Sequence, residues 1–273
     1  MPKQENAAEN TAAVTNDILK MFNMAKMPLL ADVGLYIGIP APILSGLHKA
    51  LALQLSEDGD RRFKNRMRYA GILKERTDNT FRWDDNTYPM AETGVIEKAL
   101  SIDFVRHGKN FIMAGPPGTG KTLLAVIVAC KAIRAGFSVK YKSAHDIATE
   151  LQEAREGFGL AGYIKRMQSY DMLVIEDITF STPDAKVAQD FFSIVDKRYG
   201  RKTTVVTTNG NVKEWIDSFP DKRMCSAFIG RLYEEALLLN MNGAIDMRLA
   251  KARGMLGSAY KEPDVGGGAV DYV

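Results

Sequence analysis

The pattern of apolar and polar residues divides the chain into an N-terminal helical part and a larger part in which strands and helices alternate. Between residues 16 and 55, apolar residues recur at helical spacing in two stretches that are separated by Gly38-Ile39-Pro40. The spacing predicts two short helices packed on each other through the apolar residues Ile18, Phe22, Ala25 and Leu29 and then Ile43, Leu47, Ala50 and Leu51.

A third helical stretch is predicted over about residues 59–76, where Phe63, Met67 and Ala70 fall on one stripe. Basic residues occupy the remainder of this helix, and those expected to contact DNA are Arg61, Arg62, Lys64, Arg66 and Arg68. Like charges on neighbouring turns repel one another unless an anion compensates them, and the phosphate backbone is such an anion. A solvated charged face is the alternative interpretation.

From Asn110 onward, short apolar runs alternate with helical patterns, which is typical of a parallel sheet covered by helices. The predicted strands are 111–114, 139–142, 172–175, 204–207 and 237–240. The expected fold class is therefore α/β, with a five-stranded parallel sheet between helices and a small all-helical domain before it.

The same pattern gives the expected domain organisation. Both ends of the chain are expected to be disordered, because the first is polar without periodicity and the last contains Gly266-Gly267-Gly268. The expected boundaries are a disordered tail over 1–15, a basic helical domain over 16–76, a linker over 77–90, a domain that contains the sheet over 91–260 and a flexible tail over 261–273.

Composition is that of an ordinary globular protein, with 25% charged and 46% hydrophobic residues among 273. A net charge of +3 permits nucleic-acid binding but is too small to be evidence for it.

Cys130 and Cys225 form no disulfide framework, and the three histidines stand far apart, so we expect a reducing compartment and no structural metal. The polar N-terminus and the lack of a long apolar run predict a cytoplasmic protein without a membrane partner.

The strongest motif lies between the first predicted strand and the following helix. Its glycines allow backbone N–H groups to turn inward around phosphates, and the helix N-terminus adds the positive end of its dipole. Lys121 is expected to reach the β and γ phosphates of ATP, and Thr122 to offer its hydroxyl to Mg²⁺. The expected nucleotide-binding residues are Gly115, Pro116, Pro117, Gly118, Thr119, Gly120, Lys121, Thr122 and Leu123.

Two further polar groups follow predicted strands. Glu176 and Asp177 end the third strand and are expected to support Mg²⁺, together with Thr122, and to polarise the attacking water. The usual order in such ATPases is Asp followed by Glu or Asp, so the reversed pair predicts slow hydrolysis. Asn209 ends the fourth strand and is expected to position the water. A turn asparagine is the alternative interpretation of this residue.

The order of these motifs resembles the IstB/DnaC branch of AAA+ ATPases, and within it the IstB-like transposition helpers of insertion sequences. Supporting features are Arg62-Phe63-Lys64-Asn65-Arg66-Met67-Arg68, Glu214-Trp215 after Asn209, and Arg231-Leu232. The resemblance, from about Ile18 to Arg253, implies a ring or helical homo-oligomer in which Arg231 completes the nucleotide site of the next subunit. It also implies a sensor role for Arg248, although Asp-Met-Arg replaces the usual Ser-Tyr-Arg.

The resemblance further implies a helical insertion over about residues 147–168 that faces DNA through Lys165 and Arg166.

The leading hypothesis is an Mg²⁺-dependent ATPase that oligomerises on duplex DNA without sequence preference, deforms it and presents it to a transposase. A replicative helicase loader is the second hypothesis, and it needs an apolar or mixed docking face in the N-terminal region. A small-molecule kinase is the third hypothesis, and the order of the motifs argues against it.

Overall fold

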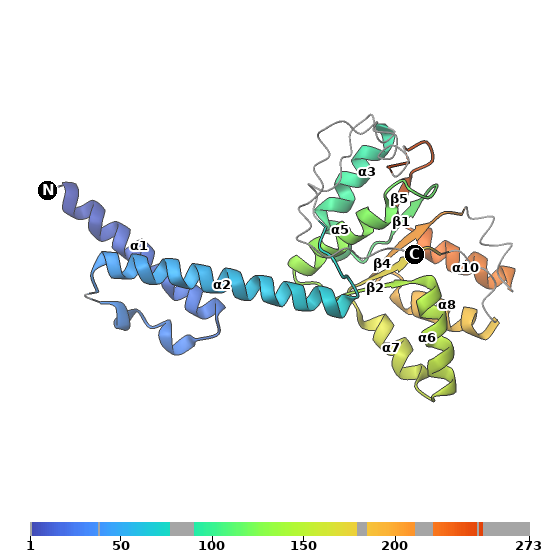
Figure 1. The fold of residues 1–273 in the computed structure, drawn as a ribbon, viewed down its shortest axis with the longest axis horizontal. Helices are drawn as coiled ribbons and strands as arrows, with labels where there is room; N and C mark the ends of the chain where they lie inside the picture. Colours follow the sequence, from blue (N-terminus) through green and yellow to red (C-terminus); the bar gives the residue numbers. More distant parts are fainter. Residues whose placement is uncertain are drawn as a thin grey trace, which may run out of the picture. The chain divides into compact units, whose positions relative to one another are not determined.

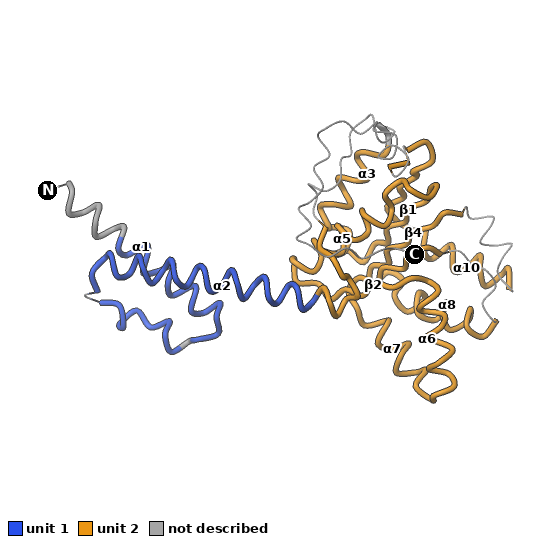
Figure 2. The backbone as a smooth tube through the Cα atoms, in the orientation of Figure 1, with its two compact units in different colours: residues 1–66 blue, residues 67–273 orange. Residues whose placement is uncertain are grey.

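The computed structural model describes residues 2–37, 39–76, 90–178, 185–210, 221–244 and 246–247. By its internal contacts the chain divides into two compact units, Met1–Arg66 and Met67–Val273 (Figure 2). Residues 67–76, expected to belong with the N-terminal helices, are therefore part of the unit that contains the sheet.

The first unit has its core between two helices and the segment that joins them. Helix α1 (Pro2–Met24) is followed by the short 3-10 helices η1 (Pro28–Leu30) and η2 (Val33–Tyr36), and then by α2 (Ala41–Ala70), which extends into the second unit. Ile18, Phe22, Tyr36 and Leu44 form the buried cluster. The Phe22 and Tyr36 rings stack with their centroids 6.3 Å apart.

Three expectations for this region were wrong. Helix α1 begins at Pro2, within the stretch expected to be disordered, because Ala, Glu and Gln favour helix and proline is tolerated in the first turn. The two stretches over 41–55 and 59–76 form one helix that ends at Ala70, before Gly71 with φ +93°. Leu29 and Ile43 were expected to pack between the two helices, but they are 88% and 61% exposed. Leu29 lies beyond the end of α1, which ends at Met24.

The described strands of the second unit form a five-stranded parallel sheet in the order β2-β3-β4-β1-β5 (Figure 1). The strands are β1 (Phe111–Ala114), β2 (Val139–Ser143), β3 (Met172–Glu176), β4 (Thr203–Thr208) and β5 (Leu237–Asn240). All five expected strands are confirmed, and the α/β fold class with them.

Helices cover both faces of this sheet (Figure 1). One face carries α3 (Met90–Ser101) and α5 (Lys121–Arg134), with the short α4 (Asp103–Arg106) beside α3. The other face carries α6 (Ala144–Glu156), α7 (Leu160–Ser169), α8 (Ala185–Arg198) and α10 (Lys222–Tyr233). Alternate strand residues such as Ile112, Leu173 and Val206 point into the core under the second set.

The topology brings the candidate motifs together. Since β1 lies between β4 and β5, and β4 lies beside β3, the carboxyl ends of β3, β4 and β1 are adjacent at one edge of the sheet. In open parallel sheets this edge is where ligands bind. Among the described helices, none has the length and apolar character needed to cross a membrane.

Candidate nucleotide site

The loop between β1 and α5 has the backbone geometry of a phosphate cradle. Gly118 and Gly120 adopt left-handed conformations with φ of +84° and +94°, which residues with a side chain rarely adopt. A Cβ atom on Gly115 would lie 2.8 Å from Met241 Cβ and 2.9 Å from its carbonyl carbon, so the loop passes too close to the end of β5 for any other residue. The Thr119 hydroxyl donates to the Pro116 carbonyl at 2.9 Å and closes the turn.

Lys121, the first residue of α5, directs its ammonium group into this loop. Its Nζ donates to the carbonyl oxygens of Gly115 and Pro116, both at 2.7 Å, and the residue is only 7% exposed. A buried positive charge is thus held at the centre of the loop, beside the helix N-terminus. This combination favours an anion with several acceptor oxygens, as a phosphate group has.

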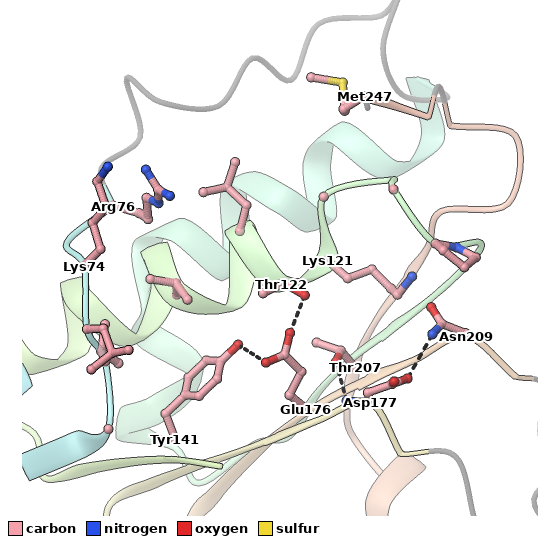
Figure 3. Close-up of a pocket in the computed structure, with 18 residues that line it drawn as sticks. Lys74, Arg76, Lys121, Thr122, Tyr141, Glu176, Asp177, Thr207, Asn209 and Met247 are labelled. Carbon is pink, nitrogen blue, oxygen red and sulfur yellow. Dashed lines mark hydrogen bonds between the residues drawn. The ribbon is translucent and has the colours of Figure 1, made fainter. Parts of the chain in front are cut away.

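The two acids at the end of β3 point to different partners (Figure 3). The Thr122 hydroxyl donates to Glu176 Oε1, and the Tyr141 phenol donates to Glu176 Oε2 at 2.8 Å. Asp177, with φ +51°, accepts from Asn209 Nδ2 at 2.9 Å, and its own N–H donates to the Thr207 hydroxyl at 2.9 Å. Glu176 therefore belongs to the Thr122 side of the site and Asp177 to the Asn209 side.

This division bears on the reversed order of the acids. Glu176 is the last residue of β3 and Asp177 is the residue after it. The position of each acid along the backbone therefore determines which partner its side chain contacts. Glu176 reaches Thr122 with a side chain that is one methylene longer than aspartate. Asp177 reaches Asn209 with a shorter one.

Tyr141 is a site residue that the sequence pattern did not identify. Register pairs Tyr141 with Val174 and Ser143 with Glu176, so Tyr141 and Glu176 lie on the same face of neighbouring strands. Burial raises the pKa of the Tyr141 phenol well above its ordinary value, and the adjacent Glu176 carboxylate raises that pKa further. The sequence showed only a tyrosine on the strand that neighbours the acidic strand. The register of the two strands is needed to know that the tyrosine hydroxyl faces the acid.

A cavity of about 680 Å³ joins these groups. It runs from the phosphate loop over Thr122 and Glu176, and Lys74 and Arg76 lie at the end opposite Lys121 and Asn209 (Figure 3). Its volume and its basic and acidic lining suit a ligand of nucleotide size.

Of the two arginines expected to act on the nucleotide, the structure describes only Arg231. Arg248 lies outside the described residues, as do Glu214 and Trp215, whereas the neighbouring Met247 lines the cavity and donates its N–H to the Gly118 carbonyl at 3.0 Å. Arg231 lies on α10 and does not line the cavity of its own chain. Its guanidinium pairs with Asp196 at 2.7 Å and lies 5.0 Å from the centre of the Phe192 ring, and the side chain as a whole is 35% exposed.

The expected DNA-contacting residues lie on α2 and α7. Arg62, Lys64 and Arg68 are exposed on α2, Arg66 is half-buried, and Arg61 pairs with Asp58. The expected insertion between the second and third strands consists of α6 and α7, and it carries Lys165 and Arg166 on its exposed surface. In the part of the chain that the structure describes, no three His, Cys, Asp or Glu side chains cluster as a metal-binding group would.

The chain is similar to ATP-binding proteins of bacterial insertion sequences. The family described as IstB-like ATP binding protein matches residues 44–254. An insertion sequence ATP-binding protein of Sinorhizobium fredii is 29% identical over 190 residues, which is 69% of this chain and 63% of that protein. The IS232 ATP-binding protein of Bacillus thuringiensis is 30% identical over 144 residues, which is 53% of this chain and 58% of that protein. The chain thus spans about three-fifths of the length of these two relatives.

Solved structures share the fold of the second unit. A DnaC helicase loader aligns with a TM-score of 0.51 and 21% identity over 59% of this chain and 94% of that one. A replication initiator DnaA bound to AMPPCP and single-stranded DNA aligns with a TM-score of 0.52 and 21% identity, over 66% of this chain and 54% of that one. At these identities the likeness establishes the AAA+ fold alone.

Proposed function

Since this chain belongs to the family of IstB-like ATP-binding proteins, we propose that it is an ATP-dependent helper of transposition that oligomerises on duplex DNA, deforms it and presents it to a transposase. The observation that carries the proposal is the phosphate loop with Glu176 turned to Thr122 and Asp177 to Asn209. Imaging the protein with duplex DNA and a non-hydrolysable ATP analogue tests it: filaments or rings on the DNA are expected, and a monomer would contradict it.

The residues present fit ATP and Mg²⁺. Lys121 and the loop N–H groups would hold the phosphates, and the Thr122 hydroxyl and Glu176 carboxylate are the oxygen ligands that Mg²⁺ prefers. When bound, Mg²⁺ would neutralise charge on the phosphates during their cleavage. Asp177 would accept the proton of the attacking water, and Asn209 would hold Asp177 in place.

Hydrolysis is expected to be slow for a reason of geometry. Asp177 is one methylene shorter than glutamate, which is one of the two acids usual at this position, and one of its oxygens already accepts from Asn209. The carboxylate therefore reaches less far toward a water beside the γ phosphate. ATP binding would then govern assembly, with hydrolysis as a later and slower event.

Arg231 is proposed to act on the nucleotide of the neighbouring subunit. Arg231→Ala is expected to lower ATP hydrolysis about 100-fold, since trans arginines stabilise transition-state charge, and to leave nucleotide affinity of the monomer within about two-fold. The measurements are steady-state hydrolysis in the presence of DNA and binding of a fluorescent ATP analogue.

Asp196→Asn provides the matched control for Arg231. This variant breaks the ion pair with Arg231 at 2.7 Å but keeps the guanidinium. If Arg231 acts in trans, Asp196→Asn retains hydrolysis, because the arginine no longer has to leave Asp196. Equal losses in the two variants would indicate that only the ion pair within the chain matters, and would contradict the trans role.

DNA binding is proposed to depend on phosphate contacts from the basic residues of α2. The logarithm of the affinity for duplex DNA is then expected to fall linearly with the logarithm of salt concentration, by roughly 0.9 for each phosphate neutralised. Arg62→Ala and Lys64→Ala should each reduce that slope by about 1, irrespective of DNA sequence. Fluorescence anisotropy over a salt series measures it.

Lys20→Ala is the control for the DNA measurement, because Lys20 is an exposed lysine of the same unit that already lies 3.4 Å from Asp17. It should leave the slope unchanged. A flat salt response of the unmodified protein would contradict DNA binding through phosphates.

One observation favours the helicase-loader alternative. The first unit exposes a set of large apolar side chains on and around η1 and η2, namely Met24, Met27, Leu29, Leu30, Val33, Leu35, Ile37 and Ile43. An apolar face of this kind is what a loader needs to bind a protein. From the sequence, the basic residues over 59–76 were expected to be the main binding surface of the N-terminal region. Tighter binding to single-stranded than to duplex DNA, together with capture of a purified replicative helicase, would favour the loader.

A further inference from the structure

Glu176 is held at both ends of its carboxylate. One oxygen accepts from the Thr122 hydroxyl on α5, and the other accepts from the Tyr141 phenol on β2 at 2.8 Å (Figure 3). A glutamate has one more rotatable bond than the aspartate usual at this position, so without a second partner its carboxylate could turn away from Thr122.

Tyr141 is itself fixed in place by the backbone around it. Its strand, β2, pairs on one side with β3 and is the edge of the described sheet. The last turn of α2 and the residue after it pack against this edge. A Cβ atom on Gly71 would lie 2.8 Å from the Tyr141 carbonyl oxygen, and Lys140 Nζ donates to the Tyr69 carbonyl at 2.9 Å. The backbone that carries the phenol is therefore held between β3 and the end of α2.

The hydroxyl of Tyr141 faces the cavity rather than the core. Tyr141 lines the same cavity as Thr122, Glu176 and Lys121. A phenylalanine would fill the same space and keep the packing of the ring, so the hydroxyl adds only its hydrogen bond to the acid. A substitution by phenylalanine therefore tests the hydrogen bond to the acid without changing the packing of the ring.

We propose that Tyr141 is a positioning residue for the metal-binding acid: its hydroxyl holds the Glu176 carboxylate in the rotamer that turns the other oxygen to Thr122. Tyr141 thereby compensates for the extra methylene of glutamate at a position where aspartate is usual. This inference rests on the proposed use of Thr122 and Glu176 to bind Mg²⁺ with ATP.

The test is a double-mutant cycle of Tyr141→Phe and Glu176→Asp in the full chain. Binding of a fluorescent ATP analogue and ATP hydrolysis are each measured over a Mg²⁺ series, and analogue binding is also measured with a chelator present. Tyr163→Phe is the control, because it removes a hydroxyl from a buried tyrosine of the same unit that does not line the cavity.

Tyr141→Phe is expected to raise the Mg²⁺ concentration for half-maximal binding and hydrolysis about ten-fold, as loss of a partner behind a metal ligand does. Binding without Mg²⁺ should stay within about two-fold, and Tyr163→Phe should resemble the unmodified protein. In the Glu176→Asp background, Tyr141→Phe should change the Mg²⁺ dependence less than about two-fold, because the shorter acid does not reach the phenol.

Two results would overturn the inference. One is a Tyr141→Phe variant with the Mg²⁺ dependence of the Tyr163→Phe control. The other is an equal loss from Tyr141→Phe in the unmodified and the Glu176→Asp backgrounds, which would indicate a purely structural role. In both cases Mg²⁺-dependent nucleotide binding by the unmodified protein would still stand. Absence of that binding would instead refute the proposed function itself.

Discussion

Replacing Lys121 with alanine should reduce the affinity for ATP at least about 100-fold and thereby abolish the assembly on DNA that we propose to depend on ATP. The buried ammonium now donates to two loop carbonyls, and it is the positive charge nearest to where the phosphates would lie. Hydrogen bonds to charged groups contribute roughly 1.5–3 kcal/mol each, and about 1.4 kcal/mol corresponds to a ten-fold change in affinity. Titration with a fluorescent ATP analogue measures the loss.

Lys98→Ala is the matched control for this measurement. Lys98 is an exposed residue of α3 in the same unit and does not line the cavity. Replacing it removes one positive charge from the protein, as Lys121→Ala does, but leaves the phosphate loop unchanged. ATP affinity should therefore be unchanged. Near-normal affinity of Lys121→Ala would mean that the nucleotide binds elsewhere, and the assignment of the loop would have to be abandoned.

The second large effect is expected from Asp177→Asn, which should lower ATP hydrolysis about 100- to 1000-fold while ATP affinity stays within a few-fold. General base catalysis contributes rate enhancements of roughly this size, and an amide cannot accept the proton. Asp177 contacts Asn209 rather than Lys121 or Thr122, so the variant leaves the phosphate-binding groups in place. Single-turnover hydrolysis with radiolabelled ATP, alongside binding titrations, separates the two quantities.

Asp103→Asn serves as the control for that experiment, since Asp103 is an exposed carboxylate at the start of α4. It should hydrolyse ATP at the rate of the unmodified protein. If Asp177→Asn retains hydrolysis and Glu176→Gln loses it, the two acids would have exchanged the roles proposed for them.

The sequence determined the parts of this protein whose physics is local. Short runs rich in apolar and β-branched residues, bounded by turn residues, identified all five strands. β1 and β3 are apolar nearly throughout because they are buried along their length, whereas β2, at the edge of the described sheet, carries two half-buried lysines. The glycine pattern before Lys121 identified the phosphate loop, since only glycine tolerates its left-handed turns. The family resemblance, drawn from the order of the motifs, was confirmed by a match over residues 44–254.

The sequence also located Glu176, Asp177 and Asn209, but it did not indicate which of the two acids contacts which partner. That Glu176 turns to Thr122 and Asp177 to Asn209 depends on the order of β3, β4 and β1 in the sheet. The contact of Tyr141 with Glu176 depends on the register of β2 against β3. A shift of one residue in that register would turn Tyr141 to the opposite face.

Helix ends and surface contacts were likewise decided by tertiary structure. The stretches over 41–55 and 59–76 read as separate helices, yet no helix-breaking proline lies between them, and the helix continues until Gly71 lies against β2. The family resemblance implied that Arg231 acts on a neighbouring subunit, and only the fold showed that within its own chain it pairs with Asp196 beside the Phe192 ring. Periodicity and motif spacing record what each segment requires locally, and only the packed sheet decides which side chains, distant along the chain, come within hydrogen-bonding distance.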